Sequence, residues 1–457
     1  MGKTYAESLA AKQKMVEKLI SPYCRVTKII GMDSLYHYRN KVHAVIAGDG
    51  RGNVFSGTYE QGSHRVVPID KCLIDNEKAD EIITDIVSLM KSFKYVPYNE
   101  DSGRGFLRHI LIRVAEKTGQ IMVTLVVATH VFPSKNNFIK ALLKIHPEIS
   151  TIIMNVNNKK TSMVLGEKEQ VLYGKGYIED KLCGRIFRIS SKSFYQINHD
   201  QTEILYNTAI ELANFSGKEN VIDAYSGIGT IGMALADKVN SVTGIELNRN
   251  AVADATANAR RNNLTNVKYL CGDAGEFMER EAASGKKYDV VLMDPPRSGS
   301  TPQFISSVAK MSPQKVVYIS CNPETLARDL GIFREKGYKA IECRAVDMFG
   351  WTGHVETVVL LSTQKTSRRI DIEIKTSEVD ITKSEAKATY EEIKEYVFNH
   401  SQLKVSNLYI AQVKAKYGII ERENYNLPKS SNSRQPKCPK EKENAIISAL
   451  KYYKMIE

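Results

Sequence analysis

The spacing of hydrophobic residues changes along this 457-residue chain and divides it into parts of different structure. In residues 1–20 apolar side chains recur at helical spacing. They follow Thr4-Tyr5-Ala6-Glu7, in which the threonine and the glutamate have the T-x-x-E spacing of a capping box. We therefore expect the chain to begin with a helix.

From about residue 25 to 190, short β-branched runs replace this pattern. The runs 110–114 and 121–128 flank residues 117–120, whose Gly119 is typical of a turn, and together they predict a hairpin. We expect this half of the chain to be β-rich and antiparallel.

Between about residues 200 and 363, short strands alternate with helical stretches. The expected strands are 221–224, 242–246, 267–271, 290–294, 316–320 and 357–361. Alternation of this kind predicts an α/β fold with a parallel, doubly wound sheet.

The last part of the chain is first polar and then helical in pattern. Residues 364–383 are expected to form a linker, and residues 384–457 a small helical module. Residues 404–457 hold 11 Lys and Arg against 5 Glu, so this module carries a large share of the net charge of +12. We expect three domains, spanning 1–192, 193–363 and 384–457.

Composition excludes several classes of protein. With 42% hydrophobic and 25% charged residues, the chain has the composition of a globular protein. No apolar run approaches the roughly 18 residues that a membrane span needs, so we expect a soluble, cytoplasmic protein. The seven cysteines are an odd number without a C-x-x-C pair, which argues against a disulfide framework or a zinc module. The positive net charge favours a polyanionic partner.

A glycine-rich loop follows the expected strand 221–224. Residues 227–232 read G-x-G-x-x-G, a pattern typical of a dinucleotide site when it opens a helix. Glu246 lies 19 residues after the first of these glycines, where a carboxylate can bind ribose hydroxyls of NAD or of S-adenosylmethionine. Asp223, close to Tyr225, favours S-adenosylmethionine, because a carboxylate beside the loop would repel a pyrophosphate and attract a cationic donor.

Two more acidic residues follow strands at the same expected edge of the sheet. Asp273 has two equally supported roles, holding an adenine amino group or capping the next helix. Asp294 opens Asp-Pro-Pro-Arg, in which the two prolines stiffen the loop and hold Asp294 and Arg297 in place.

A cysteine and a glutamate complete the candidate chemistry. Cys321 directly follows the expected strand 316–320, beside a helix start that would lower its pKa, whereas Cys271 and Cys343 are interpreted as inert, buried residues. Glu356 precedes the last expected strand. It is a candidate catalytic residue only because that cysteine is present. A thiolate that adds to carbon 6 of a pyrimidine activates carbon 5, and a base then removes the carbon-5 proton. For His354, a structural or substrate-orienting role is at least as well supported as a role in proton transfer.

Five ordered motifs within residues 190–361 closely resemble the RNA uracil-5-methyltransferases that act on ribosomal and transfer RNA. They are F-x-Q-x-N at 194–198, the cofactor loop at 223–232, D-P-P-R at 294–297, S-C-N-P at 320–323 and H-V-E-T at 354–357. The resemblance implies a Rossmann-like class I methyltransferase domain that uses S-adenosylmethionine, with an antiparallel, β-rich, RNA-facing domain before it.

The resemblance also assigns roles to particular side chains. It implies a nucleophile at Cys321 and a proton acceptor at Glu356. It implies contacts to the methyl donor by Gln196, Tyr225, Glu246, Asp273 and Asp294.

The chain departs from many members of that family in two respects. They carry an N-terminal β-barrel (TRAM) domain and a four-cysteine iron–sulfur site. We expect no TRAM domain, because the sequence starts too late for one, and no iron–sulfur cluster, because only Cys24, Cys72 and Cys183 precede the catalytic part, without cluster spacing. Thr230 often corresponds to asparagine in relatives, and we propose that the helical tail replaces the missing RNA-binding domain.

These features predict methylation of carbon 5 of a uridine flipped out of structured RNA, by a protein that acts as a monomer. Ribosomal 23S RNA is the favoured substrate and transfer RNA the alternative. An NAD-linked oxidoreductase, a cytosine methyltransferase and a non-catalytic RNA-binding factor are the competing interpretations. The candidates for holding phosphates are Arg39, Lys41, Arg104, Arg108, Arg113 and Arg297.

Overall fold

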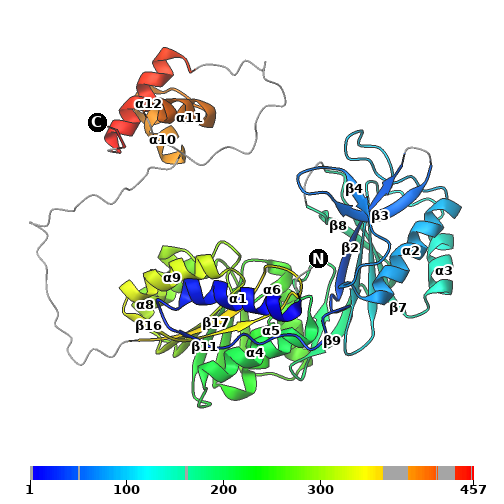
Figure 1. The fold of residues 1–457 in the computed structure, drawn as a ribbon, viewed down its shortest axis with the longest axis horizontal. Helices are drawn as coiled ribbons and strands as arrows, with labels where there is room; N and C mark the ends of the chain where they lie inside the picture. The colour runs from blue at the N-terminus through cyan, green and yellow to red at the C-terminus, as the bar shows by residue number, and fades with distance from the viewer. Residues whose placement is uncertain are drawn as a thin grey trace, which may run out of the picture. The chain divides into compact units, whose positions relative to one another are not determined.

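The computed structural model describes residues 4–49, 52–159, 163–363, 390–417, 419, 438–453 and 455–456. The chain divides into two compact units, residues 1–367 and residues 368–457. Figure 1 shows the elements of both units.

The β-rich half of the first unit forms one mixed sheet covered by two helices. Its strand order among the described residues is β4(Val66–Pro68), β3(Val54–Tyr59), β2(Lys41–Gly48), β5(Leu107–Val114), β6(Ile121–Val127), β7(Ile149–Val156) and β8(Lys168–Gly174). The helices α2(Glu77–Ser92) and α3(Lys135–Ile145) bury their apolar residues against one face of this sheet (Figure 1).

The expected hairpin is confirmed, because β5 and β6 pair antiparallel around residues 117–120. The expectation of a purely antiparallel half is wrong, because β6 and β7 run parallel. A parallel pair needs a crossover connection, and α3 supplies it. The expectation of a β-rich half also leaves out the helix α2. The helical spacing of Ile82, Ile86 and Met90 is the sequence signal that predicts it.

The second sheet carries the α/β half. Its strand order is β1(Arg25–Val26), β16(Tyr338–Val346), β17(Glu356–Thr363), β15(Lys315–Ser320), β14(Val290–Met293), β11(Asn220–Ala224), β12(Ser241–Glu246) and β13(Val267–Cys271). The strands expected from the sequence are all present, and β16 adds to them. The last strand, β17, runs antiparallel to β15, so the expectation of a wholly parallel sheet is corrected there.

Two hydrophobic clusters cover the two faces of this sheet. Neighbouring residues of β11 alternate between them, since Val221 belongs to one cluster and Ile222 to the other. One face is covered by α4(His199–Ala213), α5(Thr230–Ala234) and α6(Arg249–Arg261), near the 3-10 helix η1(Ala236–Lys238) and the hairpin β9(Ile178–Leu182)–β10(Arg185–Ile189). The other is covered by α1(Tyr5–Ile20), α7(Ala274–Ala283), α8(Pro302–Met311) and α9(Pro323–Glu335).

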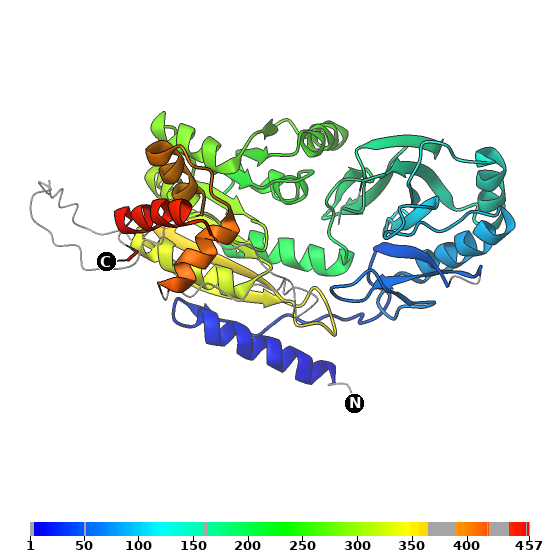
Figure 2. The same ribbon diagram turned by 90° about the horizontal axis from the view of Figure 1, so that it is seen from above.

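The N-terminal helix packs on the α/β half, although the sequence groups it with the β-rich half. Its capping box between Thr4 and Glu7 is confirmed. Val16 and Ile20 of α1 are fully buried in the cluster that covers the α/β sheet, and β1 pairs with β16. Figure 2 shows α1 running along the strands β16 and β17. Residues 4–30 therefore help to build the sheet that carries the candidate site.

The second unit contains α10(Tyr390–Ser401), α11(Asn407–Lys416) and α12(Lys440–Tyr452), which bury a small apolar core of their own. Ser406 caps α11, as its sequence suggests. The expected linker 364–383 lies outside the described residues. Within residues 404–457, α11 and α12 contain five lysines and two glutamates, so half of the surplus of six positive charges lies in these two helices.

Candidate active site

The chain topology brings the predicted catalytic residues to one edge of the α/β sheet. Cys321 directly follows β15, and Glu356 begins β17. Because β17 is antiparallel to β15, Thr357 lies opposite Ser320, and its hydroxyl donates a hydrogen bond of 3.1 Å to the carbonyl oxygen of Ser320. Two residues separated by 35 positions in the sequence are thus held at neighbouring strand ends.

The glycine-rich loop is held by the carboxylate of Glu246. Its two oxygens accept hydrogen bonds from the backbone N–H groups of Gly227, at 3.0 Å, and of Asn248, at 2.7 Å. Gly227 and Gly229 have φ values of +55° and +83°. A Cβ at Gly229 would lie 2.5 Å from the hydroxyl of Tyr269, whereas one at Gly227 would meet nothing within 4 Å. The loop is therefore packed on one side and open above Gly227.

Asp223 provides a test of whether the loop fits a cationic cofactor. This carboxyl group is buried, and burial together with Asp294 and Glu246 raises its pKa to about 7. One oxygen accepts a hydrogen bond from the N–H of Gly232, and the other has no hydrogen-bond partner among the described residues. An unpartnered buried oxygen among acidic neighbours fits a ligand that carries positive charge, as S-adenosylmethionine does at its sulfonium and amino groups.

Tyr225 and Asp273 border the same loop. Tyr225 has a positive φ of 67°, rare for a residue with a side chain, and its ring lies 5.7 Å from that of Phe304. Asp273 is exposed and caps α7 by accepting a hydrogen bond of 3.0 Å from the N–H of Glu276. Burial raises the pKa of Tyr225, and the negative charge of Asp273 adds to this rise, so the two groups are near enough to interact electrostatically.

Gln196 and Thr230 have partners elsewhere in the fold. The carbonyl oxygen of Gln196 accepts a hydrogen bond of 3.1 Å from the side chain of Asn40, which ties the F-x-Q-x-N segment to the start of β2. The hydroxyl of Thr230 is hydrogen-bonded to that of Tyr206 at 2.9 Å. Thr230 is thus engaged inside the protein.

The electrostatic surroundings of Cys321 differ from those expected. Burial and the charges of Glu356 and Asp294 raise the pKa of its thiol, while Arg297 opposes the rise. The expectation that the start of α9 lowers this pKa is therefore wrong. Loss of solvent and two nearby acids make the thiol less acidic than that of a free cysteine.

Glu356 shares these surroundings. Its side chain is 4% exposed, and burial together with Asp294 raises its pKa to about 8, again against the effect of Arg297. Burial raises the pKa of Asp294 to about 7. The site is thus a group of coupled acids and a thiol beside the guanidinium of Arg297.

The other residues singled out in the sequence lie in different surroundings. His354 is exposed, and its ring stands edge-on to Phe349. Cys343 is buried, as expected, but Cys271 is exposed, so its interpretation as a buried residue is wrong. Its strand, β13, forms the end of the sheet, where side chains are less covered.

Two of the arginines proposed for phosphate binding are used inside the protein. Arg108 is 2% exposed and forms hydrogen bonds of 2.7 and 2.9 Å to the two carboxylate oxygens of Glu100. Arg113 is also buried, donates to the carbonyl oxygens of Ser191 and Ser193, and has its pKa lowered to about 10 by burial. Neither guanidinium is available to RNA.

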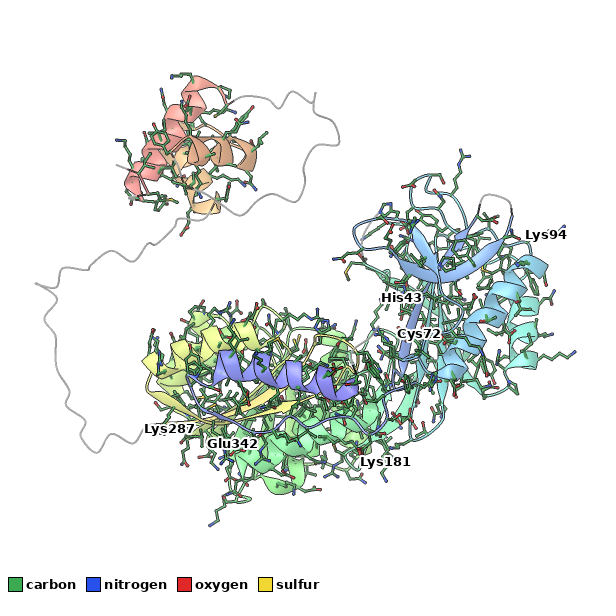
Figure 3. The ribbon with its side chains drawn as sticks, viewed as in Figure 1. His43, Cys72, Lys94, Lys181, Lys287 and Glu342 are labelled. Carbon is green, nitrogen blue, oxygen red and sulfur yellow. The ribbon has the colours of Figure 1, made fainter. Side chains whose placement is uncertain are left out.

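The start of β2 keeps a group of cations. Burial and the charges of Arg113 and Arg39 lower the pKa of Lys41 to about 8. The pKa of His43, two residues further along this strand (Figure 3), is lowered to about 4 by burial and by Lys41 and Arg39. Because these positive charges destabilise one another, an anion bound beside them would stabilise them.

Within the described parts of the chain, no group of three or more His, Cys, Asp or Glu side chains is arranged to hold a metal ion. None of the helices in these parts has the length and hydrophobicity to cross a membrane.

The strand order and the acidic, glycine-lined edge define a class I methyltransferase fold of the Rossmann-like type. The model of the tRNA (uracil-5-)-methyltransferase family matches residues 4–364. The chain belongs to this family and is an RNA methyltransferase, which excludes the oxidoreductase interpretation. The second unit lies beyond the matched residues.

Several known proteins are similar to this chain. An uncharacterized RNA methyltransferase of Halalkalibacterium halodurans is 39% identical over 363 residues, which cover 78% of this chain and 79% of the relative. One of Clostridium acetobutylicum is 43% identical over 364 residues, with coverage of 78% and 79%. The crystal structure of the Pyrococcus abyssi tRNA (uracil-54, C5)-methyltransferase with S-adenosyl-L-homocysteine is 28% identical, with a TM-score of 0.67, covering 78% of this chain and 83% of that one.

Proposed function

We propose that this protein transfers a methyl group from S-adenosylmethionine to carbon 5 of a uridine in structured RNA through a covalent cysteine adduct. The observation that carries the proposal is the placement of Cys321 and Glu356 at neighbouring strand ends, where the charge of Glu356 adds to the rise that burial causes in the pKa of the Cys321 thiol. A non-catalytic RNA-binding factor would have no use for a coupled thiol and carboxyl group.

Cys321 is the proposed nucleophile. Its thiol loses a proton to solvent, and the thiolate adds to carbon 6 of the uracil ring, which gives carbon 5 the electron density to accept a methyl group. Because the pKa of this thiol is raised, the thiolate is a minor species at neutral pH. The base is proposed to be flipped out of the RNA so that carbon 6 can reach the sulfur.

Glu356 is the proposed proton acceptor. After methyl transfer its carboxylate removes the proton from carbon 5, the double bond between carbons 5 and 6 reforms, and the thiolate leaves. A pKa of about 8 suits a carboxylate that must hold this proton and then release it to solvent near neutral pH.

S-adenosylmethionine supplies the electrophilic methyl group. The proposed donor contacts are Gln196, Tyr225, Glu246, Asp273 and Asp294. They are supported by the acidic environment of the loop and by the open space above Gly227. Calorimetric titration of the full chain with S-adenosylhomocysteine tests whether this chain has the proposed donor site.

The RNA substrate is proposed on two grounds. The sequence pattern favours 23S ribosomal RNA, and the similarity to the Pyrococcus abyssi enzyme favours transfer RNA as the second candidate. Mass-spectrometric mapping of 5-methyluridine in both RNAs, from cells with and without the gene, decides between them. Loss of 5-methyluridine from neither RNA would contradict the proposal.

The positive residues of the tail are proposed to add affinity for RNA, and the protein is proposed to act as a cytoplasmic monomer. A monomer is supported by the presence of all proposed catalytic and donor-binding residues within one compact unit, 1–367.

A further inference from the structure

The single tryptophan of the chain is partly exposed at the edge of the α/β sheet that carries Cys321 and Glu356, here called the catalytic edge. Trp351 lies in the loop between β16 and β17, and 42% of its surface is accessible. The pairing of Val346 with Glu356, and of Ser320 with Thr357, places this loop at the strand ends that carry Cys321. A large aromatic side chain thus remains in solvent five residues before the proposed proton acceptor.

A second exposed aromatic ring lies against it. Tyr36 is 47% accessible, and its ring centroid is 6.2 Å from that of Trp351 at an interplanar angle of 29°, a stacked arrangement. Tyr36 belongs to the segment that connects the α/β sheet to β2, so the pair joins the catalytic loop to the entrance of the β-rich half. Tyr36 also lines a cavity of about 420 Å³ beside the start of α4, which is large enough for a nucleobase.

The loop beneath Trp351 is firmly held, although the ring itself is only partly covered, by the rings of Tyr36 and of Tyr5, whose centroid lies 5.9 Å away. Lys12 of α1 donates hydrogen bonds to Asp347, at 2.7 Å, and to the carbonyl oxygen of Phe349, at 3.0 Å. The hydroxyl of Thr352 donates to the same carbonyl at 2.8 Å. Trp351 has a φ of +66°, which costs energy for a residue with a side chain. A strained, anchored backbone that leaves an indole in solvent is typical of a binding residue.

We propose that Tyr36 and Trp351 form a platform on which an unpaired nucleobase of the substrate RNA stacks, next to the uridine in the active site. Proteins recognise unpaired RNA chiefly by stacking bases on aromatic rings, which every base permits. This inference rests on the proposed function, because the ligand is taken to be the RNA that carries the target uridine. It adds two residues that hold the RNA strand beside the target uridine. In this proposal the platform contacts bases and not phosphates.

The single tryptophan makes the platform observable without catalysis. Fluorescence excited at the indole reports Trp351 alone in the full-length protein, and a base stacked on the ring quenches it. The probes are a single-stranded RNA of mixed sequence, the same RNA with abasic sites, and heparin. We expect strong quenching by the intact RNA and little by the abasic RNA or heparin, which carry the negative charge without the bases. Equal quenching by all three, or by none, would overturn the proposal.

Substitutions separate stacking from folding. Trp351→Ala and Tyr36→Ala are each expected to weaken binding of this RNA by about tenfold, while Trp351→Phe and Tyr36→Phe retain most of it. Circular dichroism and thermal unfolding establish that each variant is folded. Unchanged affinity in both folded alanine variants contradicts the platform, as does a change of fluorescence on raising the protein concentration alone, which would assign the pair to self-association.

The outcome is distinguishable from failure of the proposed function. If the wild-type protein methylates RNA and Trp351→Ala does so with unchanged KM and kcat, the platform is wrong and the methyltransferase stands. If quenching and its loss occur as expected but no 5-methyluridine forms, the RNA surface stands and the uridine chemistry is wrong.

Discussion

Lys12 and Asp347, which are 335 residues apart in the sequence, form a buried ion pair of 2.7 Å with side chains 3% and 0% exposed. The other oxygen of Asp347 accepts a hydrogen bond of 2.9 Å from the hydroxyl of Tyr5. The first helix is thereby fixed to the loop that leads to Glu356. The helix α1 is therefore part of the architecture that supports the proposed catalytic residues.

Breaking this pair should destabilise the protein. Removing one partner of a buried pair leaves an uncompensated charge, so Lys12→Met is expected to lower the free energy of unfolding by about 3 kcal/mol. Urea unfolding of the full-length chain measures the change. Lys14→Met, at an exposed position on the same helix, is the matched control and should change stability by less than about 0.5 kcal/mol. Equal effects of the two substitutions would contradict the structural role of the pair.

The proposed covalent mechanism predicts opposite results for its two residues. Glu356→Gln has no carboxylate to remove the carbon-5 proton, so the RNA adduct should accumulate after methyl transfer. Denaturing gel electrophoresis should then reveal a slowly migrating band that disappears on treatment with ribonuclease. Cys321→Ala should abolish both the band and methylation, and the double variant should form no adduct. A Cys321→Ala protein with full activity would refute the mechanism.

The methylation rate should rise with pH. The pKa of Glu356 is raised to about 8, and that of the Cys321 thiol is raised as well. Both groups act in their deprotonated forms, so a single-turnover rate should increase as the pH rises from about 7 to 9. A profile that is flat over this range would contradict the electrostatic description of the site.

Arg297 should set the position of that profile. Its positive charge lowers the pKa of both Glu356 and Cys321. Arg297→Met removes this charge, raises both pKa values, and should move the profile to higher pH, whereas Arg297→Lys should move it less. A shift to lower pH in Arg297→Met would show that the sign of this coupling is wrong.

Substitution by alanine should have different effects at two glycines of the glycine-rich loop. Gly227→Ala adds a methyl group in open space at a φ of +55°, so it should weaken S-adenosylhomocysteine binding with a loss of stability of only about 1 to 2 kcal/mol. Gly229→Ala brings a Cβ within 2.5 Å of the Tyr269 hydroxyl and should destabilise the fold more strongly. Calorimetric titration and thermal unfolding measure the two effects. Tight donor binding by Gly227→Ala would place the cofactor elsewhere.

Removal of the tail tests its proposed role in RNA binding. Deleting residues 384–457 should weaken RNA binding and reduce its dependence on salt, because fewer counterions are released. The family match ends at residue 364, and 1–367 forms a compact unit, so methyl-donor binding should persist. Unchanged RNA affinity and salt dependence would refute the role of the tail.

Local features could be predicted from the sequence because they depend on neighbouring residues. Short patterns in the sequence predict the capping box at Thr4, the hairpin around Gly119 and the strands of the α/β half. The helices α2 and α3 were missed, although their periodicity is present. The parallel pairing of β6 with β7 has no local signal, because it depends on how α3 packs across the sheet.

The order of residues along the chain by itself determined the family resemblance, the donor loop and the pairing of a cysteine with a glutamate as candidate chemistry. Only the tertiary structure decided that α1 supports the catalytic loop, that Arg108 and Arg113 are buried, and that Trp351 and Tyr36 meet in solvent. It also decided that the pKa of Cys321 is raised. Burial and the charges that face a group across space set its electrostatics, and these arise from contacts between segments that lie far apart in the sequence.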